Sequence, residues 1–105
     1  MSENLTVNQV RVLSTLMNGD KYGLEIIKAI QEESGAKLFL GTLYNLMNSL
    51  EKKGYVKSRW GEATSERGGN RRKYYEITGA GENVLNDTRS SLMRLWNGNI
   101  NLSMT

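Results

Sequence analysis

The 105-residue sequence predicts a mainly α-helical domain with a small β-hairpin. Apolar residues recur every three or four positions in three successive N-terminal segments, as they do in amphipathic helices. Two segments with alternating side chains then flank a loop that contains a Gly-Gly pair, which is typical of a hairpin. One more periodic segment follows, and a chain of this length has room for a single core.

The three N-terminal helices are expected over residues 7–17, 21–34 and 40–53. Thr6 is the predicted N-cap of the first helix and Asp20 that of the second. The oxygens of these side chains can accept hydrogen bonds from the first free backbone amides of a helix. The short polar turn Asn18-Gly19-Asp20 is therefore expected to end the first helix and begin the second.

The hairpin is expected to join a strand at residues 55–60 to a strand at residues 71–77. In the first strand Val56, Ser58 and Trp60 share one face, because successive side chains of a strand point to opposite sides. This face is predicted to pack inward, and the other face to stay in solvent.

Positive charge is concentrated on the hairpin. Residues 57–73 hold six Lys or Arg side chains against two Glu, a net charge of +4, whereas the whole chain carries +3. A basic run can be an ordinary solvated surface. Charge gathered on one element of a nearly neutral body is, however, what a polyanion-binding surface requires.

The exposed face of the third predicted helix carries short polar side chains in place of the usual mixture of Glu and Lys. They are Thr42, Asn45, Asn48, Ser49 and Lys52. Neutral surface filler is one interpretation, although most of these residues form helices poorly. The functional interpretation is base recognition, since Asn can contact adenine through two hydrogen bonds and Thr can meet a polar base edge or a thymine methyl.

Three short helices followed by a hairpin predict a winged helix-turn-helix. In this arrangement the third helix enters the major groove of double-stranded DNA and the hairpin, called the wing, lies on the DNA backbone. The residues predicted from these patterns to bind DNA are Thr42, Asn45, Asn48, Arg67, Asn70, Arg71, Arg72 and Lys73.

The residue types that the chain lacks narrow its function further. It has no Cys and no His, which removes disulfides, thiolate nucleophiles, the usual zinc ligands and the usual general base at neutral pH. We see no paired carboxylates for acid–base catalysis, so we expect no enzyme, no metal site and no cofactor. No segment approaches the ~20 apolar residues of a membrane span and no signal peptide is evident, so we expect a cytoplasmic chain.

Four sequence blocks stand in a fixed order: YGLEII at 22–27, GTLY at 41–44, LEKKGY at 50–55, and RRKYYEIT at 71–78 followed by Gly81. Over about residues 7–96 their order and spacing resemble the PadR family of bacterial transcriptional regulators, in its short form with a single C-terminal helix. The resemblance implies a winged-helix homodimer, usually a repressor of transporter or stress-enzyme genes. Many members are released from DNA by small aromatic or cationic compounds.

The same resemblance implies DNA contacts from the start of the second helix, from the third helix and from the wing. The matching residues are Tyr22, Thr42, Tyr44, Arg71 and Arg72, and Lys21, next to Tyr22, is also predicted to bind DNA. Family members often have Pro at the positions of Leu40 and Asn45. These departures alter the helix start and one side chain near the bases, so the operator sequence does not follow from the resemblance.

The last helix is expected over residues 82–97. Its apolar positions follow a 3-4-3 spacing that suits packing against another helix, and core or dimer packing is the plainer interpretation. The resemblance adds a dimer interface and, as in some members, a central drug-binding pore near Leu92, with Trp96 one turn later on the same face. The predicted interface or effector residues are Leu85, Thr88, Leu92, Leu95 and Trp96.

We therefore expect a winged helix-turn-helix domain over residues 1–78, a C-terminal dimerisation helix over 79–97 and a flexible tail over 98–105. The expected function is a homodimeric repressor of a pseudo-palindromic operator, with release by a small hydrophobic, aromatic or cationic effector as an addition. Two alternatives stay open. One is a winged-helix protein-interaction module with weak or non-specific DNA binding, and the other is a carrier of hydrophobic compounds.

Overall fold

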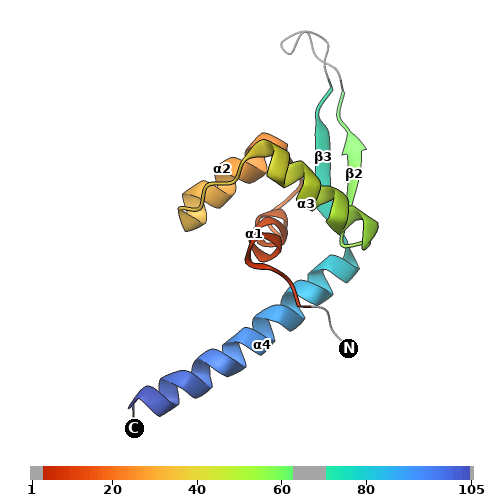
Figure 1. Ribbon diagram of the computed structural model, residues 1–105. Helices are drawn as coiled ribbons and strands as arrows, with labels where there is room; N and C mark the ends of the chain where they lie inside the picture. The colour runs from red at the N-terminus through yellow and green to blue at the C-terminus, as the bar shows by residue number, and fades with distance from the viewer. Residues whose placement is uncertain (1–3, 63–70, 105) are drawn as a thin grey trace.

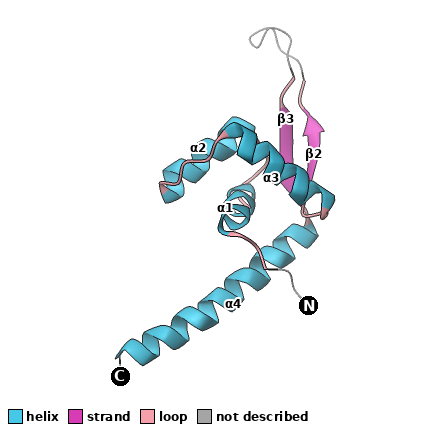
Figure 2. Cartoon of the chain, in the orientation of Figure 1, coloured by secondary structure: helices cyan, strands magenta, loops and turns pink. Residues whose placement is uncertain are grey.

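The computed structural model describes residues 4–62 and 71–104. Figure 1 shows three helices grouped around one core, a hairpin that stands away from them, and a long helix that extends to the other side. Helices and strands are distinguished in Figure 2. The elements are α1 (Val7–Leu16), β1 (Lys21–Tyr22), α2 (Gly23–Ser34), α3 (Leu40–Lys52), β2 (Val56–Trp60), β3 (Lys73–Ile77) and α4 (Gly79–Met104). The predicted winged helix-turn-helix class is confirmed.

Thr6 caps α1 as predicted. Its Oγ1 accepts a hydrogen bond from the backbone N–H of Gln9 at 3.2 Å, and Oε1 of Gln9 accepts one from the N–H of Thr6 at 2.9 Å. This reciprocal capping box satisfies backbone donors that the helix itself leaves free. The helix start is therefore fixed by two residues whose types can be read in the sequence.

The sheet has one strand more than expected. β1 pairs antiparallel with Tyr74 and Tyr75 of β3, so the strand order is β1-β3-β2. A segment of two residues is too short to show the alternation from which a strand is predicted. The added strand joins the inner strand of the wing to the start of α2.

The predicted N-cap at Asp20 is wrong. Tyr22 occupies the N-cap position of α2, and its backbone N–H donates to Oε1 of Glu25 at 3.1 Å. The Asp20 carboxylate instead accepts a hydrogen bond from Nη2 of Arg59 at 3.1 Å, forming an ion pair. The acid thus faces a cation of β2, which is distant in sequence.

The predicted inward orientation is right for Val56 and wrong for Trp60. Val56 is 2% exposed, whereas Trp60 is 57% exposed. In Figure 1 the β2–β3 pair leaves the helices as it approaches the loop. Trp60 lies where the hairpin has left the helices, so it stays exposed and becomes part of the wing surface.

The core lies between α1, α2, α3, the base of the sheet and the first turns of α4. From α4 it takes Val84 and Leu85. The other buried apolar side chains are Val12, Leu13, Leu16, Ile26, Ile30, Leu38, Leu43, Met47, Leu50, Val56 and Tyr75. Beyond these turns α4 leaves the core, and it continues past residue 97, the predicted end of this helix.

α4 begins against the turn that follows α3. Oγ1 of Thr78 accepts a hydrogen bond from the N–H of Gly81 at 3.1 Å and donates one to the carbonyl oxygen of Gly54 at 2.6 Å. A Cβ atom at Gly81 would collide with the carbonyl oxygen of Tyr55 and would lie 2.8 Å from Cγ1 of Ile77. Close backbone packing therefore requires glycine at this position.

Candidate nucleic-acid interface

α3 has an outward face of short polar side chains, as the sequence predicts. Thr42, Asn45 and Asn48 are all exposed. The opposite face is fully buried through Leu43, Met47 and Leu50. The helix is thus held by its apolar residues, and its amide and hydroxyl groups are free to meet a ligand.

Aromatic rings hold two cations on the sheet. The guanidinium carbon of Arg72 lies 4.2 Å from the centroid of the Tyr22 ring, and that of Arg59 lies 4.9 Å from the centroid of the Tyr74 ring. The two tyrosine rings meet edge to face at 5.6 Å. Cation–π contacts of this kind restrict a guanidinium without removing its charge. Arg59 is also paired with Asp20, so Arg72 is the one of the two that adds positive charge at a defined position.

Two further cations of the wing, Arg71 and Lys73, lie beside Trp60. Nε of Arg71 donates to the carbonyl oxygen of Gly61 at 2.8 Å, which fixes the side chain across the hairpin. Nζ of Lys73 lies 5.8 Å from the ring centroid of Trp60 and 5.7 Å from that of Tyr75. Each cation thus has a defined contact and still presents its charge at the surface.

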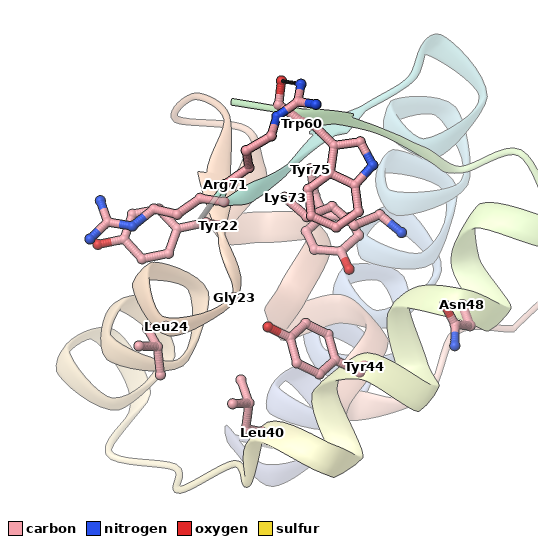
Figure 3. A pocket seen from close by; sticks show the side chains of 11 residues that line it. Tyr22, Gly23, Leu24, Leu40, Tyr44, Asn48, Trp60, Arg71, Lys73 and Tyr75 are labelled. Atoms are coloured by element: carbon pink, nitrogen blue, oxygen red, sulfur yellow. Dashed lines mark hydrogen bonds between the residues drawn. The ribbon is translucent and has the colours of Figure 1, made fainter. Parts of the chain in front are cut away.

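A cavity of about 470 Å³ lies between the start of α2, the side of α3 and the wing. Figure 3 shows Leu24, Leu40 and Tyr44 at one end, and Arg71 and Trp60 at the other. Its walls also include the three consecutive wing cations of residues 71–73. The helix that is predicted to read bases and the strand that is predicted to hold phosphate therefore border the same hollow.

Gly23 and Tyr75 shape this cavity. A Cβ atom at Gly23 would lie 3.0 Å from Oη of Tyr44, so glycine lets the Tyr44 ring approach the start of α2. Tyr75 is 2% exposed, and burial raises the pKa of its phenol; the nearby Tyr44 and Glu51 raise it further. The phenol therefore stays protonated near neutral pH.

Not every predicted DNA-binding residue lies at the cavity. Nζ of Lys21 donates to the carbonyl oxygens of Thr15 at 2.6 Å and Gly19 at 3.4 Å, so it caps the end of α1. The predicted contacts Arg67 and Asn70 fall outside the described residues.

Of the predicted DNA-binding set, Tyr22, Tyr44, Asn48, Arg71, Arg72 and Lys73 line the cavity, whereas Thr42 and Asn45 face outward from α3 without lining it. Sequence reasoning missed Leu24, Leu40 and Trp60 as part of this surface. Their apolar character favours the core, and the register that exposes them is set by tertiary structure.

The predicted interface residues of α4 divide into two groups. Leu85 is 7% exposed and belongs to the core of the chain, and Thr88 is half-buried. Farther along, Leu92 is 56% exposed, Leu95 63% and Trp96 61%. Covered and uncovered apolar residues therefore follow each other on one helix.

These features match a known group of proteins. Residues 12–87 match the transcriptional regulator PadR-like family. The chain belongs to the PadR family. PadR-family proteins are DNA-binding transcriptional regulators, and the outward polar face of α3 and the cationic wing are the surfaces suited to that task.

Solved structures support the assignment. A transcriptional regulator from Clostridium thermocellum is 36% identical, with a TM-score of 0.72 over 89% of this chain and 88% of that one. A PadR family regulator from Eggerthella lenta is 32% identical, with a TM-score of 0.76 over 93% and 82% of the two chains. A protein from Lysinibacillus sphaericus is 31% identical over 87 residues, which cover 81% of this PadR-family chain and 73% of the relative.

Among the described residues, no helix is both long and apolar enough to cross a membrane.

Proposed function

We propose that this PadR-family protein is a homodimeric repressor that binds a pseudo-palindromic operator in the cytoplasm. The observation that carries the proposal is the uncovered apolar face of α4. Leu92, Met93, Leu95 and Trp96 are between 50% and 63% exposed. So many large apolar side chains on one exposed stretch of a small domain favour a contact surface.

A second copy of the chain is the occupant that we propose for this face. α4 has 26 residues, so it is about 39 Å long, and Figure 1 shows that most of it extends beyond the other helices. An equivalent helix related by two-fold symmetry would supply the same apolar residues in return. The division into a DNA-binding domain over residues 1–78 and a dimerisation helix after it is part of this proposal.

A two-fold dimer also fits the geometry of DNA. It would present two copies of α3 to major-groove segments about 34 Å apart, which is one turn of the duplex. The wing cations would lie on the backbone beside each half-site and add affinity that does not depend on sequence. A regulator that covers an operator in this way blocks transcription from it.

Release by a small effector is the second part of the proposal. Leu92, Met93, Leu95 and Trp96 line a surface hollow of about 480 Å³. Between two α4 helices it would bind a planar aromatic compound through ring stacking or, where the compound is cationic, through cation–π contacts, worth about 0.5–2 kcal/mol per ring. Such a compound should quench the fluorescence of a Trp60→Phe variant, which keeps Trp96, and leave a Trp96→Phe variant unchanged.

The decisive experiment titrates the purified protein with the DNA upstream of its own gene and with random duplex DNA, and measures its mass by sedimentation. We expect a dimer at micromolar concentration. At physiological salt it should bind the upstream DNA about 10³-fold or more tightly than the random duplex. A monomer with equal affinity for both DNAs would contradict the proposal and favour the protein-interaction module.

A further inference from the structure

Three large apolar side chains are exposed where α2 and α3 begin. Leu24 is 60% exposed, Phe39 70% and Leu40 38%. Phe39 is the N-cap residue of α3 and makes no side-chain capping bond. Ser, Thr, Asp or Asn would stabilise that position by about 1 kcal/mol. The chain therefore exposes apolar surface at a helix start where a polar residue would be more stable.

Two of these residues share the cavity with the wing cations. Leu24 and Leu40 line it together with Arg71 and Lys73. A Cβ atom at Gly23 would lie 3.4 Å from Cδ1 of Leu40, so Leu40 is positioned against the start of α2. Figure 3 shows the two leucines at the end of the cavity opposite Arg71. One surface thus has an apolar end and a cationic end.

This combination matches one feature of duplex DNA. The thymine C5-methyl is the apolar group that base pairs present in the major groove, whose other edge groups are hydrogen-bond donors and acceptors. The groove is bordered by anionic phosphates, which complement the cations of residues 71–73. The N-terminal residues of a recognition helix are those that reach base edges, and Phe39 and Leu40 stand at that end of α3.

We propose that Leu40, flanked by Leu24 and Phe39, contacts thymine methyl groups and gives this protein a preference for thymine beneath the start of α3. The inference rests on the proposed operator binding and adds the base that is read and the residues that read it. Asn45 and Asn48 would supply hydrogen bonds farther along the helix, so hydrophobic and polar readout occupy successive turns of α3.

The test uses duplexes that the full-length protein selects from a random-sequence library. Each thymine of a selected duplex is replaced in turn by deoxyuridine, which lacks only the C5-methyl. Loss of one buried methyl should lower affinity about fourfold, the equivalent of about 0.8 kcal/mol. At the same positions a Leu40→Ala variant should bind the thymine and deoxyuridine duplexes equally.

The matched control is Val7→Ala. Val7 is 65% exposed, lies at the start of α1 and does not line the cavity. This variant should keep the full response to deoxyuridine. Thermal unfolding of both variants checks that they are folded. A Phe39→Ser variant, which introduces a capping side chain, should be more stable than the wild type and should bind the selected duplex more weakly.

Each other outcome is decisive. Selected duplexes that bind equally well with deoxyuridine at every thymine overturn the methyl contact and leave the proposed operator binding intact. A Leu40→Ala variant that retains the wild-type methyl response assigns the contact to another residue and also overturns the proposal. A library that yields no preferred duplex contradicts both the operator binding and the methyl contact. A change of oligomeric state in Leu40→Ala would instead identify the surface of Leu24, Phe39 and Leu40 as a contact between subunits.

Discussion

The guanidinium carbon of Arg72 lies 4.2 Å from the centroid of the Tyr22 ring. The contact links the wing to the residue that precedes α2, beside the pairing of β1 with β3. The charge of Arg72 therefore has a fixed position relative to the helices. An arginine that is held on a ring can present its outer N–H groups to phosphate at little entropic cost.

An Arg72→Lys variant should separate charge from position. Lysine keeps the positive charge and loses the stacked guanidinium, so we expect a loss of about 0.5–1 kcal/mol in the free energy of unfolding. The dependence of DNA affinity on salt should stay the same because the number of neutralised phosphates is unchanged. Chemical denaturation and a salt titration measure the two quantities, and a shallower salt slope would show that the charge itself has moved away from DNA.

Removing both neighbouring charges should weaken all DNA binding alike. In an Arg71→Ala/Arg72→Ala variant, each lost phosphate contact should reduce the slope of log K against log salt by about 0.9, on operator and random DNA. Lys57→Ala is the charge control, since Nζ of Lys57 pairs with Oε1 of Glu76 at 3.8 Å. An unchanged slope in the double variant would exclude the wing as the backbone anchor.

Replacing Asn45 or Asn48 by Ala should reduce specificity more than affinity. Each lost base contact should cost about 1–3 kcal/mol on the operator and almost nothing on random DNA. Competition binding with both DNAs gives the ratio. An equal loss on the two DNAs would mean that these amides contact phosphate, and no loss at all would return them to the role of surface filler.

A Leu95→Glu variant should remain folded as a monomer. Leu95 is 63% exposed in the single chain, so a carboxylate there should change the stability of the monomer little. In a dimer the same carboxylate would be buried in the apolar contact without a partner, which strongly disfavours association. Operator affinity should fall by about 10²-fold or more, because the two half-sites are no longer linked. Asn97→Glu adds the same charge at another exposed position of α4 and serves as the control. Sedimentation and operator titration report the results, and a dimeric Leu95→Glu protein would place the interface elsewhere.

A methyl group at Gly81 should destabilise the fold. Its Cβ would collide with the carbonyl oxygen of Tyr55, so we expect a loss of about 1–3 kcal/mol in the free energy of unfolding. Gly79→Ala is the matched control, because a Cβ there meets no atom within 4 Å among the described residues. Thermal unfolding of both variants provides the comparison. Equal stabilities would indicate that α4 shifts without cost at its first turn.

Local patterns in the sequence are enough to predict much of this fold. Thr6 caps α1 because the residue types that form a capping box lie three positions apart. The period of α3 separates Leu43 and Met47 from the outward Asn45, so the face suited to base contacts follows from the order of the residues alone.

Features that depend on distant parts of the chain were not predictable in this way. Asp20 has the right chemistry for an N-cap, but the pairing of β1 with β3 moves the start of α2 to later residues. The Asp20 carboxylate instead forms an ion pair with an arginine of β2. The side chain of Trp60 is on the same face of its strand as the buried Val56, yet it is exposed because the hairpin has left the helices at that point. Leu85 and Leu92 belong to the same apolar pattern of α4, but the first is buried and the second is exposed. The point where the helix leaves the core depends on tertiary structure and not on this pattern.

The length of α4 has a consequence for DNA spacing. It runs as one continuous helix from the base of the wing outward (Figure 1). In a two-fold dimer, the point where two such rods cross fixes the separation of the paired recognition helices. Moving that crossing by one helical turn shifts each subunit by about 5.4 Å along the rod. If the leucines and the tryptophan of α4 form the proposed dimer contact, the permitted spacing between operator half-sites would be set by side chains that do not contact DNA. The length of α4 would then determine operator spacing.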